Sequence, residues 1–189
     1  MRRHAGRVVA LAAAVALSAG CAHYSLVEPQ PRTVADRYVV EPQIRWSAAT
    51  DGKWEVWTVD GPGLQAVQFL NGLEDGEPLF SRTEEQKRLR FKASMTPGEI
   101  AELLADALAA SGAQKVAVAG VRPHRFGTAD GFRCELTFLN SAGLEKQAIA
   151  AGAVVDARLY LIVYGGARLH YFAKHREHAE RIIQSVRMK

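Results

Sequence analysis

The chain has 189 residues, of which 48% are hydrophobic and 23% charged, and its formal net charge is +4. Residues 1–20 hold three of the 24 basic residues and none of the 20 acidic ones, so the other residues carry 21 basic and 20 acidic side chains, a net charge of +1. This balance argues against a nucleic-acid partner, which requires clustered positive charge, and the one basic stretch, residues 87–92, is expected to be a solvated edge. The hydrophobic content and the absence of repeats indicate one globular domain.

The first 21 residues have the three regions of a secretory signal peptide. Basic residues within 2–7 precede ten apolar residues (8–17), and small residues (18–20) end on Cys21. Ten apolar residues are too few to span a bilayer, which takes about 20 in a helix. A cysteine directly after such a run resembles the lipobox of bacterial lipoproteins, where the thiol is joined to a diacylglycerol and becomes the first residue of the mature chain.

Lipidation of Cys21 predicts a protein anchored in the bacterial cell envelope. Ala22 follows the cysteine where inner-membrane retention would favour Asp, so the outer membrane, facing the periplasm, is favoured. The alternative is an ordinary secretory signal cleaved elsewhere, with Cys21 incidental. With Cys21 modified, Cys134 has no partner within the chain, so no disulfide framework is expected.

The sequence predicts three segments. Residues 1–20 form the signal peptide, and residues 21–37 form the lipidated N-terminus and an extended tether, because Pro29 and Pro31 favour polyproline geometry. At about 3.1 Å per residue this tether spans up to roughly 50 Å. Residues 38–189 form the globular domain.

Strands dominate the first half of that domain. Residues 53–59 alternate with Trp54 on one face and Trp57 on the other, so this strand is expected to be covered on both sides. The other predicted strands are 38–40, 44–46, 64–70 and 88–93, with a loop over 72–81.

The best-marked helix is predicted over 97–111. Thr96 and Glu99 form a capping box, in which each side chain bonds the backbone amide of the other, and Pro97 occupies the first helical position. Apolar residues at helical spacing follow on one stripe, and Gly112 ends the helix.

An antiparallel meander and a last helix complete the chain. The predicted strands are 115–122, 132–139, 144–155 and 158–164, and the predicted helix is 169–187. Within 132–139 the alternation places Cys134 inward and Arg133 outward. The fold class is therefore α+β, with about six or seven antiparallel strands and two main amphipathic helices, one on each side of the sheet.

Several strings in the chain resemble a group of uncharacterised bacterial lipoproteins, over most of residues 38–187. They are residues 57–62, 75–79, 95–97, 152–161 and 170–172. The order of elements is also similar to the PsbP-like fold, found in an extrinsic photosystem subunit and in a Ran-binding import factor. The resemblance implies an assembly or binding accessory without a shared catalytic motif.

Candidate catalytic or metal-binding side chains are few. Cys134 is a candidate nucleophile, or a small core residue, as free cysteines commonly are. His170, His175 and His178 are candidate metal ligands, or else residues of a helix face, since no hydrolytic zinc motif accompanies them.

Two further features have alternative interpretations. Gly165-Gly166 before a helix could present amides to an anion, or form a tight turn. Trp46, Trp54 and Trp57 could stack on a ligand, or belong to the core.

Two hypotheses of function follow. The first is a lipid-anchored, non-catalytic binding or assembly accessory with an envelope protein partner and no cofactor or nucleic acid. The alternative is a small envelope hydrolase or metal-dependent enzyme that uses Cys134 or the group of His170, His175 and His178.

Overall fold

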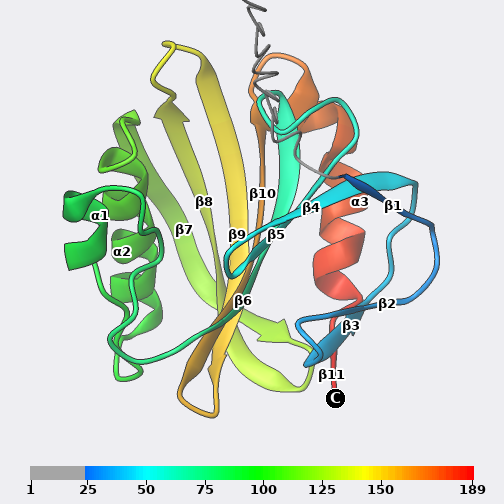
Figure 1. Cartoon of the computed structure of the whole chain (residues 1–189), viewed down its shortest axis with the longest axis horizontal. Helices are drawn as coiled ribbons and strands as arrows, with labels where there is room; N and C mark the ends of the chain where they lie inside the picture. The colour runs from blue at the N-terminus through cyan, green and yellow to red at the C-terminus, as the bar shows by residue number, and fades with distance from the viewer. Residues whose placement is uncertain (1–23) are drawn as a thin grey trace, which may run out of the picture.

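The computed structural model describes residues 24–189, so the predicted signal peptide and Cys21 lie outside the described residues. An eight-stranded antiparallel sheet is the centre of the domain, in the order β1-β4-β5-β6-β10-β9-β8-β7 (Figure 1). Its strands are β1 (Ser25–Val27), β4 (Trp46–Asp51), β5 (Trp54–Thr58), β6 (Gln65–Leu73), β7 (Gln114–Phe126), β8 (Ala129–Leu139), β9 (Glu145–Val155) and β10 (Arg158–Ala167). A second sheet joins β2 (Arg32–Val34), β3 (Tyr38–Val40) and β11 (Arg187–Met188).

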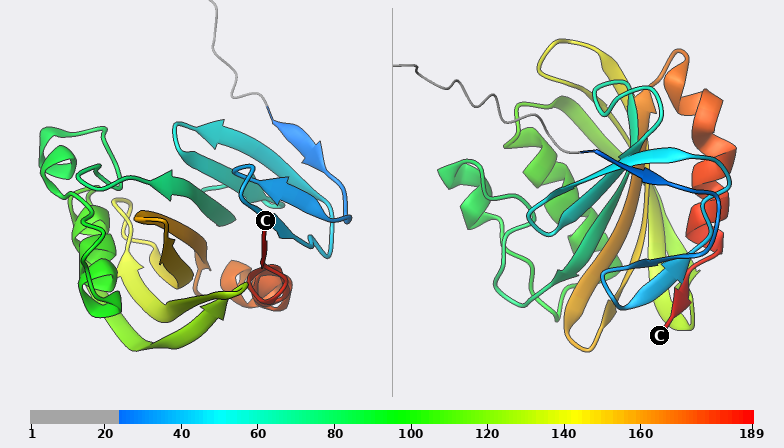
Figure 2. Two further views of the ribbon diagram at one scale, coloured as in Figure 1. Left: turned by 90° about the horizontal axis from the view of Figure 1, so that it is seen from below. Right: turned by 45° about the vertical axis from the view of Figure 1, so that its right-hand side comes forward.

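Helices cover both faces of the large sheet. The helices are α1 (Glu84–Arg88), α2 (Pro97–Ala109) and α3 (Tyr171–Gln184). Figures 1 and 2 show α1 and α2 on one side of the molecule, and α3 on the other side near the small sheet. Within residues 24–189, no helix combines the length and apolar character needed to cross a membrane.

Two hydrophobic clusters lie on opposite faces of the sheet. Trp57 and Phe69 belong to the cluster under α3 and the small sheet, while Trp54 and Leu70 belong to the cluster under α2. Strand β5 therefore contributes a tryptophan to each cluster, which confirms the prediction that it is covered on both sides.

Helix α2 begins with the predicted capping box. The Glu99 amide donates to the Thr96 hydroxyl oxygen at 3.3 Å, and the Thr96 amide donates to the Glu99 carboxylate at 2.7 Å. These bonds satisfy amides that the first turn leaves without helical partners. Ile100, Leu103 and Leu104 then face the sheet and are buried.

The α+β class is confirmed, but the predicted number of strands, about six or seven, is too low. Part of the difference arises at residues 25–34, expected within an extended tether. These residues form β1 and β2, with Val27 and Val34 almost fully buried. Strand β1 pairs with β4, which lies further along the chain, and β2 pairs with β3 across a turn. These pairings place the apolar side chains of both strands in the core.

Other predicted boundaries also shift. Residues 84–88 form α1, because Thr83 and Gln86 make a second capping box, and only an isolated bridge from Pro78 to Arg90 remains of the strand predicted at 88–93. Strand β4 begins at Trp46 rather than Ile44.

The prediction that Arg133 faces water is wrong. Its side chain is only 9% exposed, because α3 packs on that face of β8, and it forms a bidentate ion pair with Glu180 of α3. The Glu180 side chain is also mostly buried, with 19% of its surface exposed. The pair joins the sheet to the C-terminal helix.

The Gly165-Gly166 pair is not a turn. Both glycines lie within β10, and α3 begins at Tyr171, two residues after the predicted start. A Cβ atom at Gly166 would lie 2.9 Å from the backbone nitrogen of Phe172, so this glycine allows the start of α3 to pack directly on the strand.

Candidate functional site: an apolar cavity between α2 and the sheet

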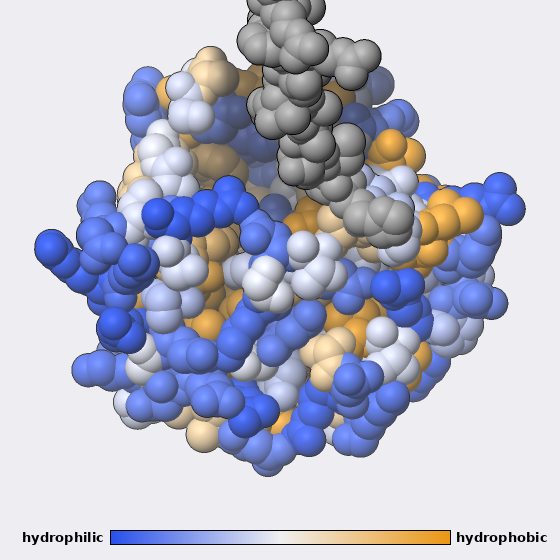
Figure 3. All heavy atoms as spheres, in the orientation of Figure 1, coloured by the Kyte–Doolittle hydropathy of each residue, from blue (hydrophilic) through white to orange (hydrophobic). Residues whose placement is uncertain are grey.

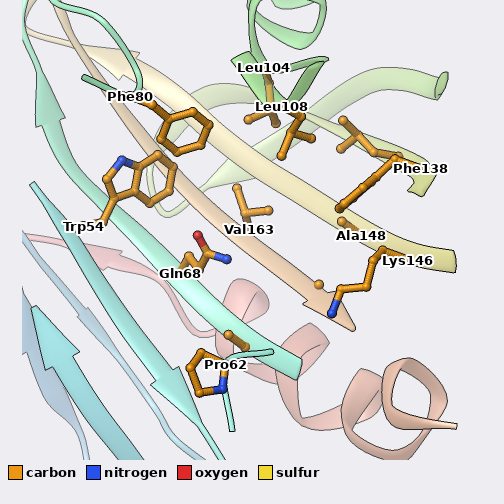
Figure 4. A pocket seen from close by; sticks show the side chains of 13 residues that line it. Trp54, Pro62, Gln68, Phe80, Leu104, Leu108, Phe138, Lys146, Ala148 and Val163 are labelled. Atoms are coloured by element: carbon orange, nitrogen blue, oxygen red, sulfur yellow. The ribbon is translucent and has the colours of Figure 1, made fainter. Parts of the chain in front are cut away.

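A partly open cavity of about 80 Å³ lies between α2 and the face of the sheet that α2 covers. Figure 4 shows Leu104 and Leu108 of α2 over one side of it, with Val163 and Ala148 of the sheet opposite. Figure 3 shows apolar side chains reaching the surface in the gap between α2 and the sheet. The lining is mostly apolar, which is typical of small-molecule and anchor-residue sites.

The floor of the cavity consists of small residues in one row across the sheet. The strand register pairs Ala66 with Gly165, Gly165 with Ala148, and Ala148 with Leu136. Cross-strand partners have side chains on the same face. Because the side chains at these three adjacent positions are no larger than a methyl group, the space that larger side chains would fill stays open.

Aromatic side chains form one end of the cavity. The rings of Trp54 and Phe80 stack, with centroids 5.5 Å apart and an interplanar angle of 27°. The Trp54 indole donates to the carbonyl oxygen of Leu79 at 3.0 Å, which fixes the ring while its apolar surface faces the cavity. This end is therefore rigid and apolar.

The other end of the cavity carries a basic group. The Lys146 amine donates to the carbonyl oxygens of Gly63 at 2.8 Å and Leu64 at 3.3 Å. Burial beside the apolar lining lowers the pKa of Lys146 from its ordinary value. Gln68 adds an amide to the wall between the two ends (Figure 4).

The loop between β5 and β6 forms the rim at this basic end. Pro62 lines the cavity, and Asp60 attaches the loop to α3 through Lys174 Nζ at 2.8 Å and His175 Nε2 at 2.9 Å. The hydrogen bond from Lys174 is the main reason that the pKa of Asp60 lies below its ordinary value. The rim is thus held by Lys146 on one side and by α3 on the other.

Cys134 is a core residue. It has no solvent exposure and belongs to the cluster under α2, as its predicted inward register requires. Burial raises the pKa of the Cys134 thiol to about 11, so the nucleophilic thiolate is scarce at neutral pH.

The three histidines do not form a common site. His175 is buried and bonded to Asp60, His178 is half-buried with its ring centroid 6.1 Å from that of His175, and His170 is exposed before α3. Among residues 24–189, no three His, Cys, Asp or Glu side chains are grouped in a way that could hold a metal ion.

The three tryptophans differ in their access to a ligand. Trp46 and Trp57 are at most 1% exposed in the cluster under α3, so neither offers a stacking surface. Only Trp54 faces a cavity.

The sequence interpretation missed most of this cavity. Lys146 and the row of Ala66, Ala148 and Gly165 were not singled out, because their significance depends on how four strands align. The repeated alanines from Ala148 to Ala151 were the one available signal, since small residues in a buried strand leave space for a neighbour.

No family model and no curated protein matches this chain. The resemblance to bacterial lipoproteins therefore stays a prediction.

Two of the solved structures that are similar to the chain are a PsbP protein and a protein involved in cell envelope biogenesis. The cyanobacterial PsbP protein (CyanoP) of Synechocystis sp. PCC 6803 is 9% identical, with a TM-score of 0.49, and the match covers 91% of this chain and 96% of that protein. LpqN, described as involved in cell envelope biogenesis of Mycobacterium tuberculosis, is 8% identical, with a TM-score of 0.40, covering 91% and 87%. A PsbP protein is thus among the similar structures, as the order of elements predicts. At TM-scores below 0.5, neither likeness carries an argument about function.

Proposed function

We propose that this chain is an envelope lipoprotein, anchored by lipid on Cys21, whose folded domain is a non-catalytic accessory that binds an envelope protein partner through the apolar cavity. Its expected place is the outer membrane, facing the periplasm. The observation that carries the proposal is the cavity itself, an unfilled apolar space with one amine at its rim.

The size of the cavity favours a protein partner over a cofactor. Pockets that enclose a whole small molecule are commonly about 300–1,000 Å³, whereas this cavity measures about 80 Å³. A space of this size suits one apolar side chain of a partner, inserted as an anchor between Trp54 and Leu108.

The ammonium group of Lys146 favours a partner that carries a negative charge beside the apolar anchor. Two of the three N–H donors of its ammonium group bond the carbonyl oxygens of Gly63 and Leu64, which leaves one donor and the positive charge for the partner. We therefore expect an acidic residue, or a terminal carboxylate, beside the apolar anchor.

The anchor on Cys21 is tested by the intact mass of the protein extracted from membranes. A chain that begins at Cys21 and carries lipid is expected. An unmodified thiol, or a precursor not cleaved before Cys21, would contradict the anchored location.

Binding at the cavity is tested by photo-crosslinking in cells. A photoreactive phenylalanine replaces Phe138, which is half-buried in the cavity wall, and in the control it replaces the neighbouring Thr137, which is exposed on the opposite face. A discrete adduct is expected at position 138 and not at 137.

A charge variant makes this test specific. Lys146→Met should abolish the adduct at position 138, whereas Lys92→Met, at an exposed lysine before α2, should leave it unchanged. Equal adducts at positions 137 and 138 would show that the cavity is not the binding site, and an adduct indifferent to Lys146→Met would contradict the role of Lys146.

A further inference from the structure

Strand β1 fixes the N-terminal end of the domain from Ser25 onward. It pairs with β4 in the register Ser25 to Ala48 through Val27 to Trp46, and it forms an edge of the large sheet. Val27 is 1% exposed in the cluster under α3. Residues from Ser25 on thus belong to the folded domain.

This attachment limits the distance between the domain and a lipid on Cys21. Cys21 stands four residues before Ser25, and an extended chain advances at most about 3.6 Å per residue, so the two Cα atoms are no more than about 14 Å apart. We infer that β1 and the sheet edge it forms rest on the surface of the lipid bilayer. This inference rests on the proposed lipidation of Cys21.

The side chains at this edge suit the interfacial layer of a bilayer. Tyr24 is 42% exposed and Leu26 is 60% exposed, and their spacing of two residues places them on the same side of the extended chain. Tyrosine is enriched at membrane–water interfaces because its ring is apolar and its hydroxyl polar. Figure 3 shows apolar side chains exposed around this edge.

Charges near β1 are arranged in pairs. Arg45 bonds Glu28 at 3.0 Å, and Arg32 bonds Glu55 at 2.9 Å. Each pair is neutral overall, so these two pairs supply no excess of positive charge for anionic lipids. A zwitterionic lipid surface, such as phosphatidylethanolamine, therefore fits best.

The test uses the lipidated protein that begins at Cys21, in phosphatidylethanolamine vesicles that contain nitroxide-labelled lipid. An environment-sensitive fluorophore is attached through Ser25→Cys, or through Ser94→Cys in the exposed link between α1 and α2, on the other side of the molecule (Figure 1). Cys134 is fully buried and does not compete for the label. We expect nitroxide quenching and a blue-shifted emission at position 25, with neither effect at position 94.

A second variant isolates the side-chain contribution. Leu26→Glu in the Ser25→Cys chain should reduce the quenching, because a carboxylate resists transfer out of water. Equal quenching at positions 25 and 94, in protein whose mass shows lipid on Cys21, would overturn the membrane contact and leave the anchor intact. An unmodified Cys21 would overturn both, and quenching unchanged by Leu26→Glu would remove the role of that side chain.

Discussion

Gly165→Ala is the substitution that measures the cavity most directly. Gly165 lies in the small-residue row on the cavity floor, and its φ is outside the left-handed region, so alanine can adopt its backbone conformation. A Cβ atom built there lies 3.6 Å from the Ala148 Cβ and 3.8 Å from the Gln147 carbonyl oxygen, which are ordinary contact distances. The added methyl group therefore makes ordinary van der Waals contacts without a clash.

Two contributions determine the expected change in the free energy of unfolding, and both stabilise the folded state. Burial of one methyl group contributes about 0.8 kcal/mol, and replacing glycine by alanine at a compatible position adds about 0.4–1 kcal/mol by restricting the unfolded chain. We expect the free energy of unfolding to rise by about 1–2 kcal/mol, which corresponds to roughly 3–6 °C in Tm for a domain of this size.

Urea unfolding followed by tryptophan fluorescence measures this change. Gly152→Ala is the matched control, also in the sheet, because its Cβ would lie 2.2 Å from the Tyr160 carbonyl oxygen. That variant should lose several kcal/mol. If Gly165→Ala is also destabilising, the space beside Gly165 is absent and the cavity cannot be the binding site. In cells, Gly165→Ala should weaken the adduct at position 138, because the anchor loses volume.

Three further results are expected. Glu180→Ala should reduce the free energy of unfolding by about 3 kcal/mol, because it leaves Arg133 buried without its partner. The double variant Arg133→Met/Glu180→Leu should lose much less, and an equal loss in both variants would contradict this reasoning. The hydrogen bond from Arg133 holds the pKa of Glu180 below its ordinary 4.5, so the pair stabilises the folded state fully above that pH. The urea concentration at the unfolding midpoint should therefore fall as the pH drops below 4.5, and it should fall less steeply in Glu180→Gln. Cys134 should react with iodoacetamide only after unfolding at neutral pH, and rapid reaction of native protein would show that the thiol is accessible.

Helices α2 and α3 could be predicted from the sequence because their signals are local, whereas the short helix α1 was missed. The residues that cap α2, Thr96 and Glu99, are three positions apart, and its apolar stripe repeats at helical spacing. The alternation in 132–139 likewise placed Cys134 correctly. Arg133 was placed wrongly in water, because its pairing with Glu180 joins β8 to a helix 47 residues further on. Alternation separates two faces of a strand, but it does not say whether the second face is covered.

The N-terminal strands and the cavity depend on contacts between distant segments. Residues 25–34 contain prolines typical of a linker, yet Val27 and Val34 supply apolar side chains that complete the cluster under α3. The cavity arises only when β6, β10, β9 and β8 align in one register. A shift of one residue in any of these strands would move the small side chains to the opposite face.

The cavity has a cost that the fold could avoid. At about 24 cal/mol per Å³, an unfilled space of 80 Å³ forfeits about 2 kcal/mol, out of a total stability that is commonly 5–15 kcal/mol. One methyl group at Gly165 would fit and recover part of this loss, while the walls at Trp54 and Lys146 are held by hydrogen bonds that keep them from collapsing inward. Small residues on the floor, rigid walls and a charged rim all maintain the same space, and departures from close packing of this kind are expected at functional sites. This combination is the physical reason to look for a partner at the cavity before any other surface of the domain.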